Sequence, residues 1–358
     1  MRLQIRPGLR RAWRAPGRLQ IGLDAAHGLV LDGLTSGDEL VLAALDGGCD
    51  ARSLPARARR AGVSEARARE LVDTLRRAHL LVPARTVRSR LARLPWAQRR
   101  AMGPDADVLS LVYPDGDGWH VLTQRRDRSV AVVGAGRIGL AVAVGLAVAG
   151  IGRVLVDDDT RVRDGDLSPG GFTEDDVGRR RGEVAADLVA ALSPDTRTSA
   201  RRDVRPDLLV LVGHGAVDPH RSDGLLREDV PHLAVLVRER DVVVGPLVLP
   251  GESACLRCLD LHRRDRDPEW PALVPQLAAR SDGAGDGEES TLARLGAALA
   301  VSQALVHLDA RFRPASVDAT LEVTLPDGLV DVRPWSAHAA CGCHWPPPPS
   351  PRVLDVVV

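Results

Sequence analysis

The stretch from Ser129 to Gly152 constrains the fold of this chain more than any other. It opens with a short β-branched apolar run, Val130 to Val133, which is typical of a strand buried on both faces. Glycines with the spacing G-x-G-x-x-G follow, and small apolar residues suited to a helix come after them. A second apolar run, Arg153 to Val156, ends in an acidic triplet, Asp157, Asp158 and Asp159. This order predicts the first half of a nucleotide-binding α/β domain.

The glycine turn carries the predicted chemistry of that domain. A phosphate would lie on the helix N-terminus, where free N–H groups and the helix dipole favour an anion. The backbone would approach it at Gly134, Gly136 and Gly139, and Asp157 stands where a ribose hydroxyl partner is expected. These four residues are the candidate nucleotide-binding residues.

Composition limits the remaining possibilities. A length of 358 residues favours two or three domains, and 44% apolar with 27% charged residues is ordinary for a soluble globular protein. The formal net charge is zero, so the charge balance favours neither nucleic acid nor a membrane surface as partner. The sequence has no uninterrupted apolar run of membrane-spanning length and no secretory signal near Met1. We therefore expect a cytoplasmic protein.

The cysteines indicate a metal site. Four of the five lie in two close pairs and predict a tetrahedral, structural zinc site: Cys255, Cys258, Cys341 and Cys343. The second pair has the spacing C-x-C, so His338 or His344 is an alternative ligand in place of one thiolate. Free buried thiols and a redox-active dithiol are the other interpretations.

Residues 1–83 predict a separate winged-helix domain. Strands are expected at Leu3–Ile5, Leu19–Leu23 and Leu29–Leu31, and the clearest helix is Glu65–His79 with Ser64 as its N-cap. Two shorter helices are expected before it, at 39–45 and 53–61. A DNA-binding regulator is one possible function, with contacts from Arg67, Arg69, Arg76 and Arg77. The same helix carries Glu65, Glu70 and Asp73, which would face phosphates unfavourably, so a nucleic-acid partner is not favoured.

This N-terminal domain resembles the leader-peptide recognition element of ribosomal-peptide-modifying systems. The resemblance implies that a leader peptide adds a strand beside the third strand and rests on the third helix. Here the strand edge would be Ala26–Leu34 and the helix Ser64–His79.

The connector, the C-terminal residues and two loop segments have residue patterns that predict their local structure. Residues 84–128 predict a connector with strands at Val108–Tyr113 and Trp119–Thr123, and residues 346–358 a proline-rich tail. The acidic, glycine-rich residues 281–290 predict a mobile loop. A hairpin is expected across Pro326-Asp327-Gly328.

Residues 129–345 resemble the ThiF family of ubiquitin-activating-like adenylyltransferases. The motifs that carry the resemblance are the glycine turn and the segment from Asp175-Asp176-Val177-Gly178 through Arg181 to Pro194. The resemblance implies an α/β, Rossmann-like domain that binds ATP and magnesium, contains a structural zinc and forms a homodimer. It places Arg181 where the family has a catalytic lysine that contacts phosphate.

This chain departs from the family pattern at three places. The family's S-N-L-x-R-Q run is Gly165–Gly170 here, without its asparagine and arginine. The family's magnesium-binding aspartate has no counterpart in Leu211–Gly215 unless His214 or Asp218 substitutes. The segment 259–340 holds no cysteine for a thioester.

A peptide-recognition domain followed by a ThiF-like domain with these losses resembles the leader-peptide-binding partner proteins of azole-forming cyclodehydratases. Two hypotheses follow from this resemblance and from the missing residues. In the first, the chain is a leader-peptide-binding partner protein that presents a precursor peptide to a YcaO-type cyclodehydratase in azole-forming peptide biosynthesis, without adenylating it. In the second, it is an active ATP-dependent adenylyltransferase that uses Asp157, Arg181 and Asp218.

Overall fold

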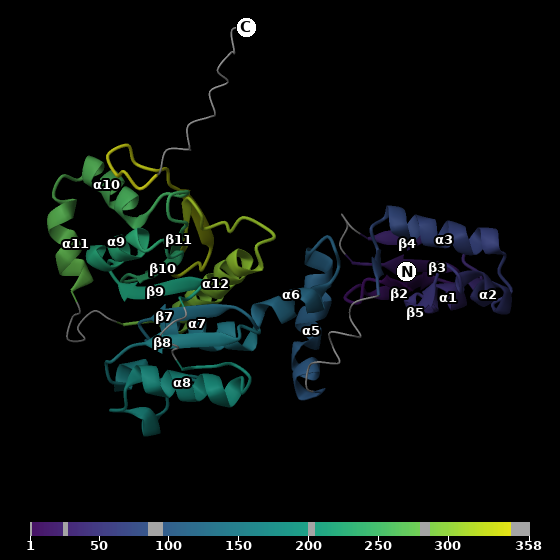
Figure 1. Cartoon of the computed structure of the whole chain (residues 1–358), viewed down its shortest axis with the longest axis horizontal. Helices are drawn as coiled ribbons and strands as arrows, with labels where there is room; N and C mark the ends of the chain where they lie inside the picture. Colours follow the sequence, from purple (N-terminus) through teal and green to yellow (C-terminus); the bar gives the residue numbers. More distant parts are fainter. Residues whose placement is uncertain (1, 24–27, 85–95, 200–204, 280–286, 345–358) are drawn as a thin grey trace, which may run out of the picture. The chain divides into compact units, whose positions relative to one another are not determined.

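The structure is a computed structural model that describes residues 2–23, 28–84, 96–199, 205–279 and 287–344. The predicted proline-rich tail at 346–358 lies outside the described residues, as does most of the predicted mobile loop at 281–290. The chain divides into two compact units, residues 1–124 and 125–358. Figure 1 shows both.

Within residues 2–84, the described part of the first unit combines two small sheets with three helices. Strands β1 (Arg2–Ile5), β5 (Asp46–Asp50) and β6 (Leu81–Pro83) form one sheet in the order β5-β1-β6. The other sheet has the order β2-β3-β4 and contains β2 (Arg11–Ala15), β3 (Arg18–Ile21) and β4 (Leu29–Leu31).

The three helices described within residues 2–84 are α1 (Ser36–Ala43), α2 (Leu54–Arg60) and α3 (Glu65–Arg77). They enclose a single core to which α3 contributes Ala68, Leu71, Val72 and Leu75. The three predicted strands and three predicted helices are present, and Ser64 caps α3 through the amide of Arg67. The predicted strands lie in two different sheets, so their assignment to a winged helix stays a prediction.

The predicted strands of the connector are wrong. Residues 96–125 form two helices, α5 (Trp96–Val112) and α6 (Gly118–Arg125). The buried positions Met102, Ala106, Ser110 and Tyr113 recur every three or four residues, which is helical spacing. The short apolar run at 108–113 suits a strand equally well when it is taken alone, and this ambiguity caused the error.

The second unit is built on a seven-stranded sheet with the order β13-β12-β11-β10-β9-β7-β8. Four strands are parallel: β7 (Ser129–Val133), β8 (Arg153–Asp157), β9 (Leu208–His214) and β10 (His232–Val237). The other three continue the sheet antiparallel: β11 (Asp241–Val248), β12 (Ala319–Thr324) and β13 (Val330–Pro334). The last two are the predicted hairpin.

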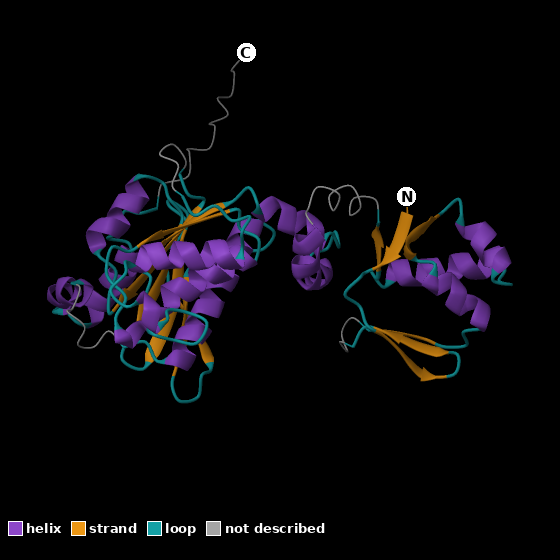
Figure 2. Ribbon diagram, turned by 90° about the horizontal axis from the view of Figure 1, so that it is seen from below, coloured by secondary structure: helices purple, strands orange, loops and turns teal. Residues whose placement is uncertain are grey.

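Helices cover both faces of this sheet, as Figure 2 shows. On one face α7 (Arg137–Val148) and α12 (Ser290–Asp309) pack on the largest apolar core, and α8 (Arg181–Leu192) lies beside α7. On the other face lie α9 (Pro219–Arg227), α10 (Leu256–Arg266) and α11 (Trp270–Ala278). The predicted Rossmann-like α/β arrangement is confirmed. The continuous apolar strands β7 to β10 form a parallel sheet, and helices bury both of its faces.

Helix α12 has the length and mean hydropathy of a membrane-spanning helix. Its residues Ala297, Ala300 and Ala304 are buried in the core together with α7 and β11. Its apolar character is therefore explained by packing inside the second unit.

Candidate functional site

The glycine turn lies at the carboxyl edge of the parallel strands, between β7 and α7. Gly134 has φ +85°, and a Cβ there would meet the carbonyl oxygen of Val212 at the end of β9. A Cβ at Gly139 would meet the carbonyl of Gly134, so the helix starts close against the strand. The two glycines therefore perform the structural roles that the motif predicts.

The acidic triplet divides between surface and interior. Asp157 ends β8 with its carboxylate exposed, and Arg221 Nη2 lies 2.9 Å from its Oδ2. Asp158 is buried and accepts hydrogen bonds from the amides of Ala135 (2.7 Å) and Thr160 (2.9 Å) and from the Thr160 hydroxyl. Sequence analysis missed this role of Asp158, although its place directly after the strand is a usable signal.

The environment of Asp158 lowers its pKa. Burial acts to raise the pKa, but the hydrogen bonds from Thr160 and Ala135 and the nearby Arg181 guanidinium outweigh it and lower the pKa. Asp158 is therefore an ionised support beneath the glycine turn.

Arg181, the candidate phosphate ligand, is paired within its own chain. Its Nε and Nη2 atoms donate to the two carboxylate oxygens of Asp166, at 2.9 and 2.6 Å. Its Nη1 lies 3.9 Å from Asp158 Oδ2. The guanidinium is mostly buried, with 19% of the side chain exposed.

The two candidate magnesium substitutes lie in different settings. Asp218 is the N-cap of α9 and accepts a 2.9 Å hydrogen bond from the amide of His220. His214 ends β9, and its Nε2 lies 3.3 Å from Glu288 Oε1.

Glu288 is the residue that sequence analysis missed most clearly, because it falls inside the predicted mobile loop. Its side chain is 5% exposed, and its Oε2 accepts a 2.7 Å hydrogen bond from the amide of Ile138 in the first turn of α7. A Cβ on Gly136 would meet Glu288 Oε1. The carboxylate of Glu288 therefore occupies the N-terminus of α7.

The four predicted cysteine ligands meet at one point. Cys255 Sγ lies 3.8 Å from Cys258 Sγ and 3.5 Å from Cys341 Sγ, and Cys258 Sγ lies 3.3 Å from Cys343 Sγ. All four sulfurs are within 4.8 Å of one another. Tetrahedral zinc thiolates at about 2.3 Å place sulfurs roughly 3.8 Å apart, so the four residues fit such an ion.

The two histidine alternatives are placed outside this cluster. His338 donates its backbone amide to Cys258 Sγ at 3.3 Å, while its ring Nε2 lies 2.9 Å from Asp265 Oδ2. His344 is exposed and forms a backbone bridge with Gly251. A metal at this point would be held by four sulfurs, with His338 supporting one of them through its backbone.

The thiols favour a bound cation. Cys255 donates a hydrogen bond to Cys258, which raises the pKa of Cys255 and lowers the pKa of Cys258 to about 4. Burial raises the pKa of Cys341, and it raises the pKa of Cys343 to about 12. Four thiolates this close repel one another, so a divalent cation is needed to deprotonate them together.

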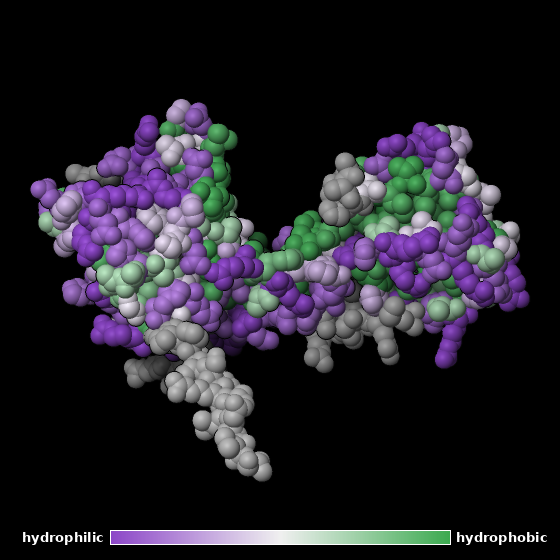
Figure 3. All heavy atoms as spheres, turned by 90° about the horizontal axis from the view of Figure 1, so that it is seen from above, coloured by the Kyte–Doolittle hydropathy of each residue, from purple (hydrophilic) through white to green (hydrophobic). Residues whose placement is uncertain are grey.

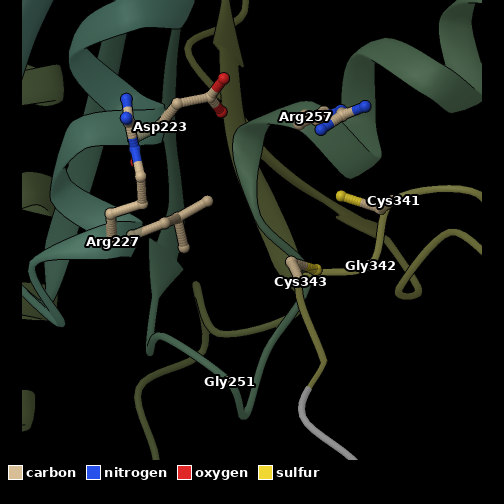
Figure 4. Close-up of a pocket in the computed structure, with 8 residues that line it drawn as sticks. Asp223, Arg227, Gly251, Arg257, Cys341, Gly342 and Cys343 are labelled. Carbon is tan, nitrogen blue, oxygen red and sulfur yellow. The ribbon is translucent and has the colours of Figure 1, made fainter.

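A pocket of about 400 Å³ opens beside this cysteine cluster. Figure 4 shows Cys341 and Cys343 on the C-terminal segment, with Asp223 and Arg227 facing the pocket from α9. Two of the four cysteines, Cys341 and Cys343, therefore line this pocket.

Part of the second unit matches a known protein family. Residues 114–210 match the model of the ThiF family. The matched residues include β7, the glycine turn, α7, β8 and α8. A search of curated proteins gave no match.

Solved structures with the same fold include MccB of E. coli. MccB with succinimide superposes with a TM-score of 0.69 at 16% identity, covering 96% of this chain and 100% of MccB. MccB with AMPCPP and selenomethionine MccA gives the same values. PaaA gives a TM-score of 0.64 at 16% identity, over 92% of this chain and 99% of PaaA. At such identities the likeness establishes the fold of both units, and no activity.

Proposed function

We propose that this chain is a precursor-peptide-binding protein of ribosomal peptide biosynthesis that does not adenylate its peptide. The N-terminal unit would hold the leader of the peptide, and the ThiF-type unit would serve as a scaffold that presents the remainder to a separate YcaO-type cyclodehydratase. A solved relative, described as the microcin C7 biosynthetic enzyme MccB in complex with N-formylated MccA, supports a peptide as the partner.

The observation that carries this proposal is the free edge of β4. In the described sheet β4 pairs only with β3, through Leu19–Leu31, Gln20–Val30 and Ile21–Leu29. The side chain of Val30 is 42% exposed, whereas Leu31 points into the core. An extended peptide can add to such an edge through main-chain hydrogen bonds and place alternate side chains against its neighbours.

Helix α3 lies close to this edge. Arg67 on α3 donates to the carbonyl of Gly33, just after β4, at 3.5 Å. The same arginine is 3.4 Å from the buried carboxylate of Asp38. Exposed apolar side chains occur on this unit, including Trp13 and Val30, and Figure 3 shows hydrophobic surface among the charged residues. The edge and the helix together offer the strand-and-helix platform expected for a leader peptide.

The arginines of α3 support a peptide partner over DNA. Three of them are paired on the helix itself: Arg67 with Glu70, Arg69 with Glu65, and Arg76 with Asp73. An arginine that is paired with a carboxylate neutralises a DNA phosphate poorly and therefore releases few counterions from the DNA. The helix α3 would thus bind duplex DNA only weakly.

The state of the ThiF-type unit supports the absence of adenylation. Adenylation needs cations directed at phosphate oxygens. Arg181 is engaged by Asp166, and Asp218 caps a helix. The zinc we propose for the four cysteines would be structural, since four sulfurs leave no open coordination position.

The test is binding of a labelled short peptide whose gene adjoins that of this chain, measured by fluorescence polarisation on the full chain. Val30→Asp places a charge on the free edge and should weaken binding at least about tenfold, or 1.4 kcal/mol. Leu40→Asp is the control, because Leu40 is an exposed apolar residue of the same unit that lies on α1 and not on β4. Equal affinity for both variants, or no binding of any neighbouring peptide, contradicts the proposal.

The second candidate is an active adenylyltransferase, favoured by the likeness to MccB structures that contain ATP or AMPCPP. ATP–pyrophosphate exchange in the presence of the same peptide separates the two candidates. Robust exchange by the wild-type chain would establish adenylation and exclude a purely presenting role.

A further inference from the structure

The N-terminus of α7 is already occupied by an anion. The amide of Ile138 donates to Glu288 Oε2 at 2.7 Å, and Gly136 is so close to Oε1 that a Cβ there would meet it. The partial positive charge of a helix N-terminus and its free amides bind a phosphate and a carboxylate by the same interactions. The two groups cannot fill this position together.

The backbone at Glu288 and the residue after it are held by further hydrogen bonds. The Glu288 backbone carbonyl accepts a 2.7 Å hydrogen bond from Arg137, whose other terminal nitrogen donates to the carbonyl of Leu167 at 2.8 Å. The next residue, Glu289, caps α12 through the amides of Thr291 and Leu292. Because α12 packs in the core against α7, the position of Glu288 beside the glycine turn is set by the packing of these two helices.

His214 makes a further contact with the Glu288 carboxylate. His214 Nε2 lies 3.3 Å from Glu288 Oε1, so the second carboxylate oxygen also faces a nitrogen from the carboxyl edge of the sheet. This places Glu288 across the space between β9 and α7 in which the glycine motif predicts a phosphate.

We propose that Glu288 is an intramolecular substitute for the phosphate and prevents nucleotides from binding at the glycine turn. The ligand class that it excludes is a nucleoside triphosphate or free pyrophosphate. This inference goes beyond peptide binding and rests only on the fold and on contacts in the second unit. Its failure would leave the peptide-binding proposal untouched, because that proposal is tested on β4.

The experiment compares nucleotide binding by the full-length chain and its variants. Mg-ATP and magnesium pyrophosphate are titrated calorimetrically into wild type, Glu288→Ala and Glu288→Gln. We expect both variants to bind at least about tenfold more tightly than wild type, since the competing anion is gone. Glu239→Gln, an exposed glutamate in the β10–β11 turn, is the matched control and should behave as wild type.

Two results overturn the inference. One is a folded Glu288 variant that binds neither probe more tightly than wild type does. The other is a wild-type chain that already binds Mg-ATP as tightly as Glu288→Gln. If Glu288→Ala fails to fold, the conservative Glu288→Gln variant decides between these outcomes.

A second measurement tests the position of the carboxylate without any nucleotide. Gly136→Ala should lower the melting temperature of the wild-type chain, because the new Cβ meets Glu288 Oε1. The loss should shrink in a Glu288→Ala background, where that atom is absent. Equal losses in both backgrounds would show that Glu288 does not contact Gly136.

Discussion

Asp157, Arg181 and Asp218 have side chains of the type found in nucleotide sites, but in this chain each contacts another group of the protein. All three are chemically suited to a nucleotide site, and each has a partner from its own chain: Arg221, Asp166 and the amide of His220. The exposed pair between Asp157 and Arg221 contributes little stability, whereas the enclosed pair between Arg181 and Asp166 is costly to break. Their assignment as nucleotide-binding residues therefore stays a prediction that nucleotide binding has to test.

At the residue scale we predict that Asp158→Asn destabilises the second unit by about 1–3 kcal/mol at pH 7, since it removes charge-assisted hydrogen bonds under the glycine turn. The folded-state pKa of Asp158 is lowered, so its contribution is complete above the unfolded value of about 3.9 and is lost as the pH falls through the lower folded value. The stability difference should thus narrow below about pH 4.

Urea unfolding at several pH values measures this difference. Asp159→Asn is the control, because the Asp159 side chain is 91% exposed and its nearest cation, on Arg180, is 3.9 Å away. A constant difference between wild type and Asp158→Asn down to pH 2 would contradict the pKa shift.

At the scale of elements, the cysteine cluster joins parts of the chain that are far apart in sequence. Cys255 and Cys258 lie at the start of α10, and Cys341 and Cys343 follow β13 near the end of the described residues. The sequence predicted which cysteines would meet, because C-x-x-C and C-x-C each bring two sulfurs together. The tertiary structure was needed to show that the side chains of His338 and His344 lie outside the sulfur cluster.

At this scale we predict about one zinc ion per chain in the purified protein, measured by mass spectrometry of metals. Cys343→Ser should lower the metal content and the melting temperature of the second unit. Cys49→Ser is the control, because Cys49 is buried in the core of the first unit and is not one of the four clustered cysteines. A metal-free wild-type chain with an unchanged melting temperature in chelator would contradict the prediction.

At the scale of the whole molecule, residues 1–124 form one compact unit, and this unit includes α5 and most of α6. Arg6, just after β1, donates to the carbonyls of Ser110, Tyr113 and Pro114, the last two at 3.0 and 2.9 Å. The helices α5 and α6 have a small core of their own with Met102, Ala106 and Leu122. These helices therefore support the N-terminal sheets.

We predict that a fragment of residues 1–124 melts cooperatively and at a higher temperature than a fragment of residues 1–83. The shorter fragment loses the hydrogen-bond acceptors of Arg6 and exposes the buried side chain of Val82 on β6, which lies against Gly116. Circular dichroism during heating measures both transitions, and equal melting temperatures would show that α5 and α6 are dispensable.

The sequence by itself determined the α/β architecture, the glycine turn, the cysteine set and most elements of the N-terminal unit. Such features are encoded locally, in apolar periodicity, glycine spacing and short cysteine motifs. The connector helices were missed because one short apolar run fits either a helix or a strand. Tertiary structure alone decided the partner of Arg181 and the position of Glu288, which lies more than a hundred residues from the turn that it fills. No local pattern encodes such a contact, because it depends on how α12 and α7 pack on the same face of the sheet.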